Sequence, residues 1–141
     1  MELQLRNRYK ILLVSACLII SILGFMVKLP HVFKNYDKEL HSIFYFISAS
    51  FLNLLFVNKK IIRHIMIFCI LYLFGISIEY AQEYSKKFHL IHGHYDIEDV
   101  YSNLKGLTTF STIWISYVAF LFGYNRWMIK KGVNNGANIR Y

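Results

Sequence analysis

The sequence is poor in helix-breaking residues and in charge. One proline and seven glycines among 141 residues are too few for a fold with many turns, so long helices are favoured. Charged residues make up only 17% of the chain, whereas soluble domains contain about a quarter. Hydrophobic residues make up 56%. A chain of this length is most simply one domain, and we expect lipid to be its solvent.

The sequence also has only two cysteines and lacks the motifs of common enzyme classes. Cys17 and Cys69 fall in separate apolar segments, and neither has a neighbour that suggests a metal or disulfide motif. We expect two buried free thiols. No phosphate-binding loop, dinucleotide fingerprint, or serine or cysteine nucleophile beside an obvious base is present. The usual soluble enzyme classes are therefore not indicated.

Four apolar segments dominate what remains. They lie at about 11–29, 41–57, 61–81 and 104–124. About 20 residues cross the hydrocarbon of a bilayer, within a range of roughly 17 to 25. Four such segments leave too little polar surface to cover them in a soluble fold. The sequence therefore predicts an all-α integral membrane bundle of four transmembrane helices, forming a single domain over 1–141, with a flexible polar tail at 132–141.

Basic residues orient these segments. Ten of the sixteen lysines and arginines lie before the first segment, around the 58–64 connection or after the last segment, where Glu2 is the one acidic residue. By the positive-inside rule, both termini are predicted to be cytoplasmic. The net charge of +8 is then explained by topology and contact with anionic lipid, so no nucleic-acid partner is expected.

The other seven acidic residues gather on the opposite side. Polar residues there recur three or four positions apart, which places each pair on one helix face: Asp37 with His41, Glu79 with Gln82, and Asp99 with Asn103. Short connections would make the three helix ends neighbours in a small bundle. We therefore expect an outward-facing polar pocket at the membrane boundary.

Glu79 is the strongest candidate in this pocket. It follows an apolar run and lies just inside the predicted boundary, where ionisable groups are costly and are functional candidates by default. Its expected partner is His41, Lys38 or the Asn103 amide. A structural lock between helices is the alternative for Glu79, and helix capping is the alternative for Asp37 and Asp96.

The order of these motifs resembles a known family. "DKELH" precedes an aromatic-rich helix, Glu-x-x-Gln ends an apolar helix, and Asp-x-x-x-Asn-x-x-Gly opens the last helix. Over about residues 36 to 110, this pattern is similar to the VanZ-like family, small bacterial membrane proteins named for a teicoplanin-resistance accessory. The matching residues are Asp37, Lys38, His41, Glu79, Gln82, Asp99, Asn103 and Gly106. The resemblance implies a multi-pass protein of the bacterial cytoplasmic membrane, and a link to glycopeptide tolerance in some relatives.

Three functions remain open on the sequence. The first is a cell-envelope accessory that binds membrane lipid or a lipid-linked or glycopeptide ligand through the eight matching residues. The second is a membrane enzyme with Glu79 or Asp99 as general base and His41 as proton partner. The third is a small subunit that docks on a membrane-protein partner.

A metal site and a cofactor are not expected. His92, His94 and Asp96 are the metal candidates, because histidine with carboxylates could suit zinc. However, "HLIHGH" lacks the i,i+4 spacing of zinc-hydrolase helices. We therefore interpret this segment as a loop.

Overall fold

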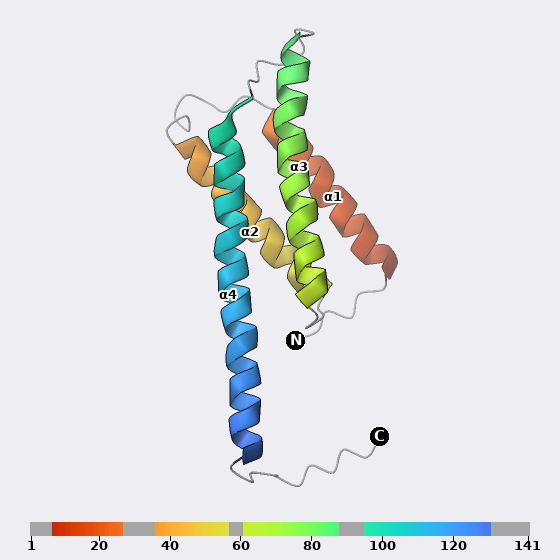
Figure 1. Ribbon diagram of the computed structural model, residues 1–141. Helices are drawn as coiled ribbons and strands as arrows, with labels where there is room; N and C mark the ends of the chain where they lie inside the picture. The colour runs from red at the N-terminus through yellow and green to blue at the C-terminus, as the bar shows by residue number, and fades with distance from the viewer. Residues whose placement is uncertain (1–6, 27–35, 57–60, 88–94, 131–141) are drawn as a thin grey trace. The chain divides into compact units, whose positions relative to one another are not determined.

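The computed structural model describes residues 7–26, 36–56, 61–87 and 95–130 (Figure 1). Within those ranges every regular element is helical, which confirms the all-α prediction. The four helices are α1 (Asn7–Met26), α2 (Asp37–Leu55), α3 (Ile61–Lys87) and α4 (Ile97–Lys130). The predicted tail at 132–141 lies outside the described residues.

The first turn of α4 explains why this helix begins earlier than its apolar segment. The Asp96 side chain accepts a hydrogen bond from the Glu98 backbone N–H at 2.8 Å, as a helix-capping aspartate does. Glu98 and Asp99 then supply negative charge to the first turn, where the helix dipole favours it. Capping by Asp96, one of the expected alternatives, is confirmed. The helix therefore includes polar residues that hydrophobicity alone leaves out.

Three helices are long and apolar enough to cross a membrane: α1 over Asn7–Phe25, α3 over Ile61–Ser85 and α4 over Ile97–Ile129. This is the composition of a multi-pass membrane protein. The described part of α2 does not qualify. Its sequence carries Ser42, Ser48, Ser50 and Asn53 among apolar residues, and one stripe of it is buried against other helices.

The chain divides into two compact units, residues 1–110 and 111–141. In the first unit, α3 packs against both α1 and α2 (Figure 1). The buried core consists of Tyr45, Ala49, Leu71 and Leu107. In the second unit, the described residues belong to the C-terminal half of α4, where the Arg126 guanidinium lies 5.0 Å from the centre of the Phe122 ring.

Gly106 sets the contact between α4 and α2. A Cβ atom at this position would overlap the Ser42 backbone oxygen and lie 3.1 Å from the Phe46 backbone nitrogen. The two helix backbones therefore touch, and only glycine fits. This contact fixes the first turns of α4 beside α2, where the polar residues of both helices lie.

The cysteine prediction is wrong on burial. Cys17 and Cys69 are free, but both are exposed on the surfaces of α1 and α3. Large hydrophobic side chains such as Ile20 and Ile70 are exposed on the same helices. In lipid, apolar groups gain little from being buried between helices, so an apolar helix does not have to bury its thiol.

Candidate functional site

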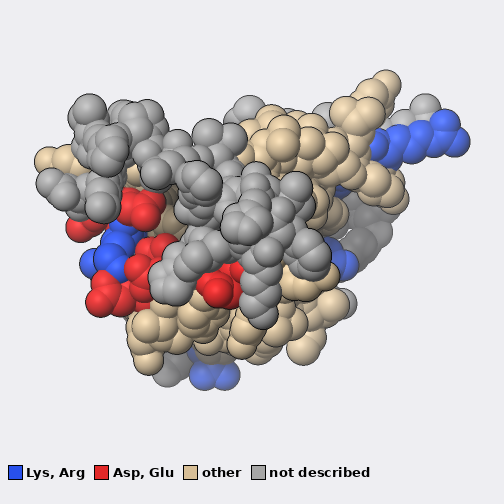
Figure 2. All heavy atoms as spheres, turned by 90° about the horizontal axis from the view of Figure 1, so that it is seen from above, with Lys and Arg blue, Asp and Glu red and all other residues tan. Residues whose placement is uncertain are grey.

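Polar side chains gather where α2 and α4 begin and α3 approaches its end. Figure 2 looks down on this end and shows acidic side chains around a basic one. The first turn of α2 contributes Asp37 and Glu39, and that of α4 contributes Glu98 and Asp99. Acidic residues suit both positions because a helix N-terminus carries partial positive charge. Helix polarity thus places carboxylates from two helices at one end of the first unit.

Four polar side chains are buried at this end: His41 (7% exposed), Glu79 (0%), Asp99 (8%) and Asn103 (2%). All four were predicted from the sequence. Together with Asp37 they are called the polar cluster below. Buried groups of this kind are costly unless they are paired or hydrogen-bonded, so their partners decide what the cluster can do.

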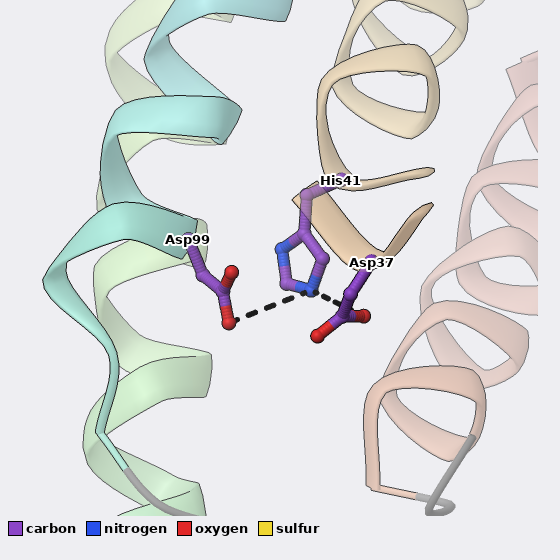
Figure 3. Close-up of side chains that lie close together, drawn as sticks. All are labelled: Asp37, His41 and Asp99. Carbon is purple, nitrogen blue, oxygen red and sulfur yellow. Dashed lines mark ion pairs between the residues drawn. The ribbon is translucent and has the colours of Figure 1, made fainter. Parts of the chain in front are cut away.

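His41 lies at the centre of the polar cluster. Its Nδ1 is 3.0 Å from Asn103 Oδ1. Because an amide oxygen only accepts hydrogen bonds, Nδ1 is the donor in this pair. Nε2 lies 3.9 Å from Asp37 Oδ1 and 4.0 Å from Asp99 Oδ2, between the two carboxylates (Figure 3). The Phe25 ring of α1 covers the imidazole, with ring centres 4.9 Å apart.

Glu79 forms a hydrogen bond to a residue that is not among its three expected partners. Its Oε2 accepts a hydrogen bond from the Asp96 backbone N–H at 3.3 Å. The start of α4 has backbone N–H groups without a partner in the helix, and Glu79 satisfies one near that start. His41 and Asp99 are close enough to interact with Glu79 through their charges.

Two carboxylate oxygens in the polar cluster have no hydrogen-bond partner among the described residues. Glu79 Oε1 and Asp99 Oδ1 are buried and have no hydrogen-bond partner within the described ranges, and the same is true of the Tyr45 hydroxyl. A buried polar atom without a partner costs about 1–3 kcal/mol, and a charged one costs more. Structural locking does not account for these oxygens, because a lock requires paired groups.

Lys38 and Gln82 were predicted as ligand-binding residues, but the structure shows them in contacts with residues outside the polar cluster. Lys38 forms ion pairs with Asp96, at 3.4 Å, and with Glu98. The hydrogen bond to Glu98, aided by Asp96, raises the pKa of Lys38. Gln82 donates a hydrogen bond of 2.9 Å to the Phe25 backbone oxygen, which ties α3 to α1. The predicted metal candidates His92 and His94 lie outside the described residues.

Tyr45 and Gly75 belong to this region but were not predicted as site residues. Tyr45 is fully buried. A Cβ atom at Gly75 would lie 2.9 Å from both the Tyr45 hydroxyl and Asn103 Nδ2. Gly75 thus leaves room for Asn103, which holds His41. The sequence feature that could have indicated Gly75 is its position one helical turn before Glu79.

Metal-ligand types also meet in the polar cluster. Asp37, His41 and Asp99 each offer one ligand atom, and these atoms lie within 4.8 Å of one another. The sequence places Asp37 and His41 on one face of α2, and the Gly106 contact supports the approach of Asp99 from α4. The structure therefore brings together three residues that were predicted to bind a ligand rather than a metal.

The fold and the site define a class: a helical, multi-pass membrane protein with ionisable side chains buried at one end of its helices. Beyond this class, no protein-family model, no curated protein and no solved structure matches the chain.

Proposed function

We propose that this protein is a cell-envelope membrane protein that binds a lipid or cell-wall-related ligand through the polar cluster. The observation that carries the proposal is the pair of buried oxygens without partners, Glu79 Oε1 and Asp99 Oδ1. Ionisable groups within membrane helices are rare and mark substrate or ion sites. A ligand that donates hydrogen bonds or carries positive charge would satisfy both oxygens.

The chemistry of the cluster narrows the ligand class. Carboxylates accept hydrogen bonds, so they suit amine and hydroxyl groups, or a phosphate bridged to them by a cation. The Asp37 side chain is 38% exposed and gives the cluster an open edge, from which a bound ligand would have to extend inward to the buried Glu79. A head group at the membrane surface could reach this edge. The VanZ-like resemblance adds cell-wall glycolipids and glycopeptide tolerance to the proposal.

The membrane arrangement belongs to the same proposal. We place α2 across the membrane as a fourth span and both termini in the cytoplasm of a bacterial cell. The excess of basic residues at the termini and around 58–64 supports this orientation. The polar cluster would then face outward, toward lipid head groups and cell-wall precursors.

Native mass spectrometry of the full chain from a mild detergent tests the proposal. Wild type is compared with Glu79→Gln, which removes the charge without changing the shape, and with Glu83→Gln as a matched control one turn later on α3. We expect a lipid adduct on wild type and Glu83→Gln that is lost from Glu79→Gln. An adduct retained by folded Glu79→Gln would overturn the proposal, and a stoichiometric protein partner in its place would favour the subunit alternative.

A further inference from the structure

We propose that Asp37, His41 and Asp99 form a binding site for a divalent cation of the zinc type. The imidazole would bind through Nε2, and each aspartate through one carboxylate oxygen. Histidine nitrogen and carboxylate oxygen are both established ligand types for zinc. The site requires only these three side chains, so it stands independently of the lipid ligand proposed above.

The spacing of the three ligand atoms suits an ion. Nε2 lies 3.9 Å from Asp37 Oδ1 and 4.0 Å from Asp99 Oδ2. Figure 3 shows the imidazole between the two carboxylates, with dashed lines for the two ion pairs. Both distances are too long for hydrogen bonds. A tetrahedral zinc ion with bonds of about 2.0–2.2 Å holds its ligand atoms roughly 3.4 Å apart. The carboxylates would therefore move by about half an ångström toward the imidazole on binding the ion.

Asn103 prepares His41 for metal binding. A metal-ligating histidine almost always donates its other ring N–H to an oxygen acceptor, which fixes the tautomer and the ring orientation. Here the Nδ1 hydrogen bond to Asn103 Oδ1, 3.0 Å long, does this. Phe25 lies against the ring and further restricts it. The other ring nitrogen, Nε2, is the one that faces both carboxylates.

Burial provides a second, independent indication. His41 and Asp99 are both buried, and Asp99 Oδ1 has no hydrogen-bond partner within the described ranges. Asp37 and the buried Glu79 are further carboxyl groups near Asp99. Carboxylates gathered in this way repel one another. A divalent cation would compensate that charge and coordinate Asp99.

A zinc ion held by these three side chains would keep a fourth coordination position open. Three protein ligands with a fourth, open position are the pattern of zinc sites that bind water or substrate. The half-exposed Asp37 side chain marks the accessible edge. If the proposed function holds, an anionic oxygen of the ligand, such as a lipid phosphate, would take the open position. This last step alone rests on the proposed function.

Zinc titration of the full chain tests the site. Protein in mild detergent is stripped with a chelator, and zinc binding is followed by calorimetry and by metal analysis after gel filtration. We expect one ion per chain. Asp37→Asn and Asp99→Asn should each weaken binding by more than about 100-fold, because loss of an outer-shell partner alone costs about 10–100-fold. Asp37→Asn changes a half-exposed residue and keeps the test valid if Asp99→Asn does not fold.

Two controls separate this site from other zinc ligands. Glu98→Gln makes the same charge change one residue before Asp99 and should bind zinc as wild type does. The double variant His92→Gln/His94→Gln removes the two histidines among the three metal candidates of the sequence and should also bind normally. Absence of tight zinc binding by wild type, equal binding by both aspartate variants, or loss of binding in the double variant would overturn the assignment.

The outcome is distinguishable from that of the lipid test. Zinc binding is measured without added lipid, and Glu79 is not among the proposed ligands. Zinc binding without a Glu79-dependent lipid adduct would support the cation site and contradict the proposed function. A Glu79-dependent lipid adduct without zinc binding would support the proposed function and contradict the cation site.

Discussion

Two histidines in the first unit each pair with an asparagine, but their surroundings differ. His41 and His64 are both buried, and the Nδ1 atom of each lies 3.0–3.1 Å from an asparagine Oδ1 on another helix, Asn103 for His41 and Asn53 for His64. Beyond that bond, His41 faces two carboxylates. The ring of His64 lies beside Phe110, with centres 5.9 Å apart.

The comparison shows that a histidine–asparagine pair does not define a site by itself. The His64–Asn53 pair connects α3 to α2 through a hydrogen bond worth about 1 kcal/mol. The His41–Asn103 pair connects α2 to α4, and it also fixes the tautomer of an imidazole that lies beside Asp37 and Asp99. Neighbouring carboxylates, not the pair, turn a helix contact into a candidate cation site. Four predictions test this difference.

The largest effect is expected for Gly106→Ala. A methyl group there would overlap the Ser42 backbone oxygen. Because neither backbone can yield easily, we expect a loss of stability of about 3 kcal/mol or more, at the upper end for overpacked sites. The His41–Asn103 contact between α2 and α4 should be lost before the His64–Asn53 contact. Thermal unfolding in detergent and zinc titration measure the two effects.

Gly123→Ala is the matched control for that variant. It lies on the same helix and has nothing within 4 Å of the added methyl. Since alanine favours helix over glycine by about 0.8–1 kcal/mol, this variant should be neutral or more stable. Destabilisation of both variants to the same extent would contradict a specific α2–α4 contact.

The second prediction compares alanine substitutions of the two asparagines. Asn103→Ala should lower zinc affinity by about 10–100-fold, the usual cost of losing an outer-shell partner. Asn53→Ala, which removes the corresponding partner of His64, should leave zinc affinity unchanged. Calorimetric titration of both variants measures the difference. Equal effects of the two substitutions would mean that the pairs do not differ in function.

The third prediction concerns His64 itself. His64→Leu removes the hydrogen bond to Asn53 and keeps an apolar side chain beside Phe110. We expect a loss of stability of about 1 kcal/mol, measured by thermal unfolding, with full zinc binding. Loss of zinc binding in a folded His64→Leu variant would move the cation site away from His41.

The smallest effect is expected for Lys38→Met. Its ion pairs with Asp96 and Glu98 join α2 to α4 at their exposed starts, and such pairs contribute less than about 1 kcal/mol. The pKa of Lys38 is raised, so its contribution is present below the usual lysine value of about 10.4 and is lost as pH rises through the raised pKa. Unfolding at several salt concentrations measures it; an effect independent of salt would contradict an exposed ion pair.

The residues that the sequence could predict were those related along one helix. Asp37 and His41 recur at i,i+4, as do Asp99 and Asn103, and the structure places all four in the polar cluster. Helical spacing needs no knowledge of neighbouring helices. Apolar length likewise located three helices that could cross a membrane.

The rest depends on contacts between helices, which one sequence does not encode locally. Glu79 bonds to the Asp96 backbone because α4 begins beside α3. Tyr45 is buried, and Gly75 leaves space for its hydroxyl. Only the structure identifies Ser42 and Phe46 as the neighbours of Gly106.

X-ray absorption at the zinc edge of the zinc-loaded full chain reports the ligands of the proposed cation site. We expect one imidazole nitrogen and otherwise oxygen ligands, at about 2.0–2.2 Å from the metal, and loss of the bound metal in Asp99→Asn. A coordination shell with two or more imidazoles, or one unchanged in Asp99→Asn, would contradict the proposed site.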